Sequence, residues 1–125
     1  MPRPRALCVT APQWLGTAHL PRLLKQAGFQ VTLLAHPASY AAKSRCVERL
    51  LPASWDPAVN VELLRKHLAE QTVAYDWITL GDDSTLWEVL RRRREPWTAA
   101  CLPVDPAGMG PELLISKASF MMEAL

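Results

Sequence analysis

The sequence predicts an α/β fold of three layers, in which an open parallel sheet of about four strands is flanked by helices. Three observations lead to this class. The 125 residues allow one hydrophobic core, since a domain takes roughly 100 to 150 residues. Short apolar runs alternate with longer amphipathic segments, which is typical of β-α-β units. Residues 5–35 contain one complete unit of this kind.

This first unit begins and ends with a strand. Arg5–Thr10 is a short apolar run, typical of a strand that is buried on both faces. Residues 13–28 carry leucines at helical spacing, with Pro21 near the helix start and Gly28 where the helix should stop. Phe29–Ala35 is the second apolar run, and we expect it to lie parallel to the first.

The middle of the chain is less regular. Residues 36–57 mix polar and apolar side chains between two proline-containing turns, and no definite element is assigned to them. Asn60–Gln71 is predicted as an amphipathic helix, with Asn60 or a nearby residue as its N-cap.

The next β-α unit follows directly. Tyr75–Leu80 is predicted as the third strand, and Gly81–Arg94 as its turn and following helix. That helix has acidic residues at its start and arginines at its end, the polarity that the helix dipole favours. Trp97–Pro103 is predicted as a short fourth strand. The whole pattern is Rossmann-like.

The character of the sequence changes near residue 104. Residues 105–111 are rich in proline and glycine, and residues 112–125 begin a helical pattern with no stop signal at Leu125. We predict a domain over residues 1–104, followed by a linker and the start of a further unit over residues 105–125. On this interpretation the chain is the front part of a longer protein.

The formal net charge of +2 depends on one run of arginines. Without Arg91–Arg94, the fourteen Lys and Arg residues fall to ten, against twelve Asp and Glu. No distributed basic face remains, so we expect no nucleic-acid partner. No apolar run approaches the roughly 18 residues of a membrane span, and no export signal is visible. Three widely spaced cysteines indicate no disulfide framework. We therefore expect a cytoplasmic protein without a membrane partner.

Ligands of an open parallel sheet bind outside the carboxyl ends of its strands. Three segments are predicted to lie there: Thr10–Thr17, Ala35–Pro37 and Gly81–Thr85. The first has one glycine, short of the fingerprint that binds dinucleotides or the P-loop. In the third, the adjacent carboxylates of Asp82 and Asp83 suit an amine or a metal, but helix capping alone also selects Asp here.

Several other candidate sites are weak in this sequence. His36 precedes a proline at a strand end, where histidine is more often a surface residue. The remaining histidines share no spacing with carboxylates or cysteines that would indicate a metal site, and we predict none. The five tryptophans are predicted to fill core and interface space, with Trp14 as the one that lies beside the strand ends.

Four segments, in their order along the chain, resemble the pre-ATP-grasp domain. They are the opening strand, turn and helix through Gln26–Leu34, then Ser44–Pro52, Trp77–Leu86 and Leu113–Phe120. This domain is the N-terminal part of ATP-grasp enzymes such as biotin carboxylase, carbamoyl phosphate synthetase and carboxylate-amine ligases. Each segment is degenerate by itself, and their order over nearly the whole chain carries the resemblance.

The resemblance implies an ATP-dependent ligase whose full-length form uses ATP and Mg²⁺. In that family a carboxylate is activated as an acylphosphate and is then attacked by an amine, a thiol or a similar nucleophile. Most of the groups for this chemistry would follow Leu125, so the isolated chain is expected to be inactive. The partner that the resemblance implies is a small-molecule carboxylate or amine.

The resemblance also suggests roles for particular residues. Gln13, Trp14 and Asp82 or Asp83 would bind the acceptor substrate at the strand ends. Lys117 matches the family lysine that contacts the nucleotide, although a serine precedes it here in place of the usual acidic residue.

Two other interpretations stay open. Residues 15–32 look like the start of a two-domain nucleotide-sugar glycosyltransferase, although the N-terminal domain of those enzymes is longer. A free-standing α/β binding or regulatory module is the third interpretation. We also hypothesise a homodimer, formed through the apolar side chains of a C-terminal helix: Leu113, Leu114, Phe120 and Met121.

Overall fold

The computed structural model describes residues 3–13 and 18–102, and its centre is one parallel sheet. The strand order is β3-β2-β1-β4, and every neighbouring pair is parallel. The predicted α/β class is confirmed, with four strands in this part of the chain. The strands are β1 (Arg5–Val9), β2 (Gln30–Ala35), β3 (Arg49–Pro52) and β4 (Trp77–Leu80).

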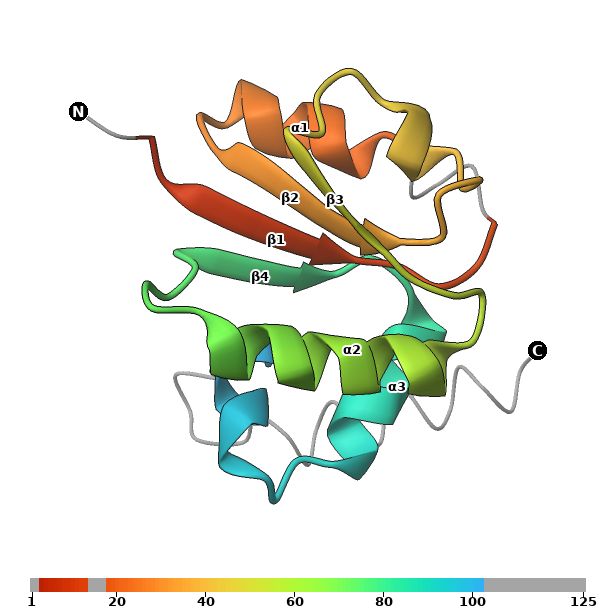
Figure 1. Ribbon diagram of the computed structural model, residues 1–125, viewed down its shortest axis with the longest axis vertical. Helices are drawn as coiled ribbons and strands as arrows, with labels where there is room; N and C mark the ends of the chain where they lie inside the picture. The colour runs from red at the N-terminus through yellow and green to blue at the C-terminus, as the bar shows by residue number, and fades with distance from the viewer. Residues whose placement is uncertain (1–2, 14–17, 103–125) are drawn as a thin grey trace.

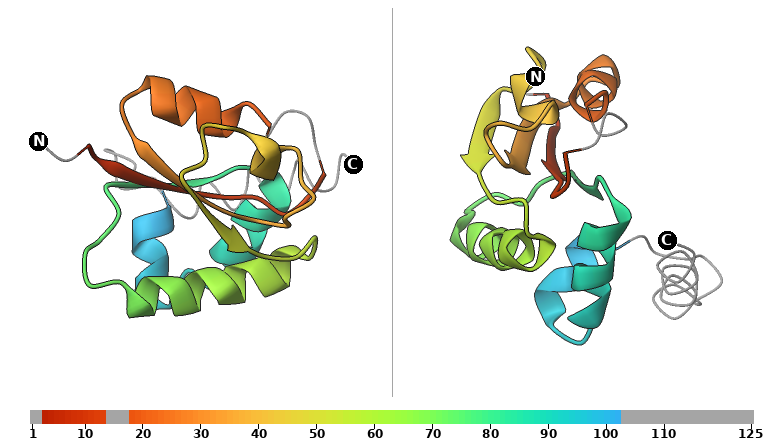
Figure 2. Two further views of the ribbon diagram at one scale, coloured as in Figure 1. Left: turned by 45° about the horizontal axis from the view of Figure 1, so that its top comes forward. Right: turned by 90° about the vertical axis from the view of Figure 1, so that its right-hand side faces the viewer.

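Helices cover both faces of this sheet, which gives the three layers of a Rossmann-like fold (Figure 1). One face holds α1 (Leu20–Gln26) and the short 3-10 helix η2 (Ala41–Lys43). The other face holds α2 (Pro57–Glu70), α3 (Asp83–Arg91) and the 3-10 helix η3 (Pro96–Cys101). Figure 2 shows the same layers from two further sides.

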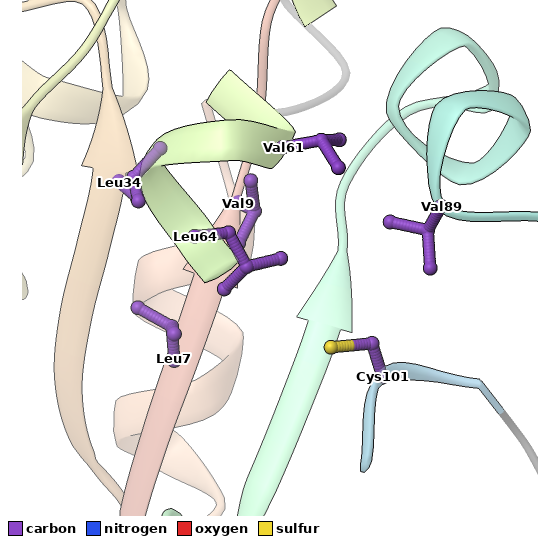
Figure 3. Packing of buried hydrophobic residues seen from close by; sticks show 7 residues of the cluster. All are labelled: Leu7, Val9, Leu34, Val61, Leu64, Val89 and Cys101. Atoms are coloured by element: carbon purple, nitrogen blue, oxygen red, sulfur yellow. The ribbon is translucent and has the colours of Figure 1, made fainter. Parts of the chain in front are cut away.

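The central strand β1 supplies side chains to both layers of core because successive residues of a strand point to opposite faces. Leu7 and Val9 pack with Leu34 of β2 beneath α2, α3 and η3, as Figure 3 shows. Cys8 points the other way, into a second cluster beneath α1 and η2. Cover on both faces therefore explains the fully buried apolar run Ala6–Val9.

One predicted strand is wrong. Trp97–Pro103 does not form a strand in the described residues, because the 3-10 helix η3 runs over Pro96–Cys101. Pro96 starts this helix, and the Thr98 hydroxyl donates hydrogen bonds to backbone carbonyls of Arg93 and Glu95 at 3.3 and 2.8 Å. These local bonds satisfy backbone acceptors without a neighbouring strand.

The fourth strand is instead β3, inside the segment to which the sequence assigned no element. Its register aligns Thr32 of β2 with Arg49 and Leu34 with Leu51. β3 lies at the edge of the sheet and is only half-buried, so its sequence lacks the continuous apolar run of an interior strand.

Helix α2 begins earlier than the sequence predicted, and its N-cap is Asp56. The Asp56 carboxylate accepts the Ala58 amide hydrogen at 2.9 Å. Asn60, the other cap candidate, is fully buried inside the first turn. Its side-chain amide donates to the carbonyls of Thr10 and Ser54 at 3.0 and 2.8 Å, and its oxygen accepts the Ser54 amide hydrogen at 2.8 Å. Asn60 therefore joins α2 to the chain that leaves β1 and β3.

Some predictions fall on residues that the structure does not describe. The boundary after residue 104, the helix predicted over residues 112–125, and Lys117 all lie outside the described ranges. Within those ranges, none of the helices is long and apolar enough to cross a membrane.

Candidate functional site

The carboxyl ends of the four strands meet at one edge of the sheet, and we call this the carboxyl edge (Figure 1). The chain builds outward from β1 to β2 and β3, and then crosses back to place β4 on the other side of β1. This reversal between β1 and β4 is the position where ligands of doubly wound folds bind. The loops that leave β1 and β4 are therefore the first candidates for a site.

Asp82 lies at this reversal, and its carboxylate is held within the fold. It accepts hydrogen bonds from the amide nitrogens of Ala11 and Thr85 at 3.0 and 2.8 Å. It also accepts from the hydroxyls of Ser84 and Thr85 at 2.6 and 2.9 Å. Only 8% of Asp82 is exposed. Through these bonds Asp82 caps α3 and joins the segment that leaves β1 (the β1 exit) to the segment that leaves β4 (the β4 exit).

Close packing explains why the residue before this aspartate is glycine. A Cβ atom on Gly81 would lie 2.5 Å from Cγ2 of Thr10 and 2.9 Å from Cδ1 of Leu20. The β4 exit therefore lies against both the β1 exit and α1. Asp83, in contrast, is exposed in the first turn of α3, where the helix dipole favours its negative charge.

Gln13 is exposed at the carboxyl edge, but its amide group also serves the fold. Its nitrogen donates to the carbonyl oxygen of Ala38 at 3.2 Å, and its oxygen accepts the Tyr40 amide hydrogen at 2.9 Å. The side chain therefore fixes the loop after β1 to the loop after β2. Trp14, the neighbouring predicted site residue, lies outside the described residues.

Two aromatic rings stack beside these loops. The imidazole of His36, after β2, lies 4.1 Å from the indole of Trp55, after β3, measured between ring centroids. The two planes differ by 6°, and 41% of Trp55 is exposed. Nδ1 of His36 accepts the Ala38 amide hydrogen at 3.0 Å, which holds the ring orientation and leaves Nε2 as the protonated nitrogen of the neutral ring.

The sequence did not single out Trp55 as a site residue. Its only signal was a tryptophan in a proline-containing turn after a weak apolar run, which many loops share. The contact with His36 depends on β2 and β3 being neighbours, and that pairing was not predicted.

The cysteine of β1 offers no reactive nucleophile to this edge. Cys8, which lies under the edge, is fully buried, and burial together with the nearby Asp82 carboxylate raises the pKa of its thiol to about 12. A thiol with so high a pKa supplies almost no nucleophilic thiolate at neutral pH. In residues 3–13 and 18–102, no three His, Cys, Asp or Glu side chains are grouped closely enough to hold a metal ion.

The structure thus brings Gln13, Asp82 and Asp83 to the same edge, as predicted from the strand ends. It shows structural contacts for Gln13 and Asp82, and an exposed carboxylate at Asp83. Comparisons with protein-family models, with curated proteins and with solved structures find no match to this chain.

Proposed function

We propose that the chain is the N-terminal, substrate-side domain of an ATP-dependent ligase of the ATP-grasp type. The observation that supports this proposal is the order of the parallel sheet, which reverses between β1 and β4 next to Asp82 and Asp83. A fold of this kind hosts many functions, so the proposal depends on what binds at the carboxyl edge. The proposed ligand is a small-molecule carboxylate or amine.

In this proposal the residues of the edge have different tasks. The exposed Asp83 carboxylate, in the first turn of α3, attracts an ammonium group. Asp82 and Gln13 keep the surrounding loops in place through the backbone contacts described above. The stacked rings of His36 and Trp55 form an apolar wall at the far side of the edge.

ATP and Mg²⁺ belong to the full-length enzyme in this proposal. The described residues include no group of carboxylates that fits a magnesium ion, and the Asp82 carboxylate already accepts four hydrogen bonds. We therefore assign no step of the ATP chemistry to this part of the chain, and the chain alone is proposed to be inactive.

A titration of the isotope-labelled chain tests the proposal. Glycine, glutamate and ATP are added separately, and amide and indole shifts are followed by NMR. We expect an amino acid to shift the signals of Asp83, Trp55 and their neighbours in sequence. Replacing Asp83→Asn should weaken this binding roughly tenfold or more, because a hydrogen bond to a charged group contributes about 1.5 to 3 kcal/mol.

The matched control is Glu70→Gln. It removes an exposed carboxylate at the last residue of α2, the end of that helix away from the carboxyl edge, and should leave the affinity unchanged. Shifts confined to the other edge of the sheet, or ATP hydrolysis by the chain alone, would contradict the proposal. A response to uridine diphosphate and to no amino acid would favour the glycosyltransferase interpretation instead.

A further inference from the structure

An apolar groove runs along β4, from Tyr75 before the strand to Leu80 at its end. It consists of two hollows of about 600 and 700 Å³ that share Tyr75, Ile78 and Ala100. We call this feature the β4 groove. Its apolar walls come from α2, β4, α3, η3 and the residue after η3: Leu68, Ile78, Leu80, Leu86, Trp97 and Leu102.

The strand that borders this groove is an edge strand in the described part of the chain. β4 pairs with β1 on one side and is last in the strand order. Trp77 on the same strand is 55% exposed. Natural proteins usually cover or blunt such an edge, since its backbone groups and apolar side chains otherwise recruit other chains.

The chain itself leaves the described structure from the wall of the β4 groove. Cys101 and Leu102, the last two described residues, both line it. The 23 residues that follow therefore start at the groove. This position makes them the nearest candidates to cover it.

The sequence of residues 112–125 has the composition that such a cover requires. On a helical projection, its polar side chains other than Lys117 fall within one narrow arc. The rest of the projection is mostly apolar, and a helix with so wide an apolar face is stable only when that face is buried. The polar arc comprises Glu112, Ser116, Ser119 and Glu123.

The residues that connect this segment to η3 are long enough for it to reach the β4 groove. The connection also favours binding within the same chain over binding to a second copy. Residues 103–111 span up to about 30 Å when extended, whereas a four-residue strand such as β4 is only about 13 Å long. A short tether gives an effective concentration in the millimolar range. That exceeds the micromolar concentration of separate copies in solution.

We infer that residues 112–125 dock as an amphipathic helix on the β4 groove of their own chain. Their apolar face covers Ile78, Trp97 and Ala100, and their polar arc faces solvent. The β4 groove then binds a segment of the same chain and not a second copy.

A spin label on Ser119→Cys, in a Cys46→Ser background, tests this inference in the full chain. Ser119 belongs to the polar arc, so the label leaves the apolar face intact, and the other two cysteines are buried. We expect paramagnetic broadening of the amide signals of Ile78, Ala100 and Leu102. Signals of β3, at the opposite edge of the sheet, should be unaffected.

Matched variants show which face makes the contact. Leu114→Glu with Met121→Glu places two charges on the apolar face and should abolish the broadening. Ser116→Glu with Glu123→Gln changes only the polar arc and should preserve it.

Two outcomes would overturn the inference. Broadening that is absent, or spread equally over β3 and β4, would show that the segment does not dock on the β4 groove. The second outcome uses a mixture of two chains, one isotope-labelled without a spin label and the other spin-labelled without the isotope. Broadening in this mixture would come from contact between separate chains. That result would assign the groove to a second copy.

Discussion

Asp82 shows how one side chain can serve two parts of the fold. Its position before an acidic, helical segment predicted a helix cap, and the bonds to Ser84 and Thr85 confirm that prediction. The bond from the Ala11 amide hydrogen could not be predicted, because it joins residues 71 positions apart. The stacking of His36 on Trp55 escaped prediction for the same reason.

Replacing Asp82→Ala should lower the free energy of unfolding by about 2 to 4 kcal/mol. Loss of a helix cap costs roughly 1 kcal/mol, and the buried Ala11 amide loses its acceptor at a further cost of about 1 to 3 kcal/mol. Urea unfolding measures the change. The neighbouring exposed variant Asp83→Ala should cost less than about 0.5 kcal/mol. Equal losses for both variants would refute the structural role of Asp82.

At the scale of elements, the two interior strands and the edge strand β4 were predicted, and the other edge strand, β3, was not. β1 and β2 are mostly apolar and are buried after their first residue, so their sequence alone shows them. β3 has two leucines between an arginine and a proline, and only its pairing with β2 makes it a strand. η3 shows the converse, because short-range bonds kept an apolar segment out of the sheet.

The contact between the β1 and β4 exits can be tested by Gly81→Ala. The added methyl group would lie 2.5 Å from Cγ2 of Thr10, and such overpacking typically costs about 1 to 3 kcal/mol. Thr10→Ser removes that Cγ2 atom. We expect the double variant to be more stable than the sum of the single losses predicts, as a double-mutant cycle measures. Additive losses would show that the two residues do not meet.

Across the whole molecule, a polar network fastens the sheet at the edge opposite the carboxyl edge. Nε2 of His67, in α2, lies 2.7 Å from the Tyr75 hydroxyl. The Arg5 guanidinium, from β1, stacks 4.4 Å from the centroid of the Tyr75 ring and donates to Gln71 at 3.0 Å. Arg5 of β1 therefore meets the much later stretch from His67 to Tyr75 around the Tyr75 ring.

This network makes stability depend on pH. Burial lowers the pKa of His67 from its ordinary 6.5, with the nearby cations Arg49 and Arg5 adding to the effect and Glu70 opposing it. Below about pH 6.5 the unfolded chain therefore binds more protons at His67 than the folded chain does. The contribution of neutral His67 is complete above that pH and declines as the pH falls towards the folded-state pKa.

Urea unfolding at pH 7.5 and pH 5 measures this effect. We expect the free energy of unfolding to fall over this range, and the fall to be smaller for His67→Gln. His19→Gln, which removes an exposed histidine, should behave like the parent chain. A His67→Gln variant with the parent's full pH dependence would contradict the assignment.

The central position of β1 also affects how the protein is made. β1 is finished at Val9, yet one of its two neighbours, β4, ends only at Leu80. During synthesis on the ribosome, one side of β1 must therefore stay unpaired until about 70 further residues have been made. In that interval the nascent chain exposes an unpaired, apolar strand edge. We expect it to depend on a chaperone most at this stage.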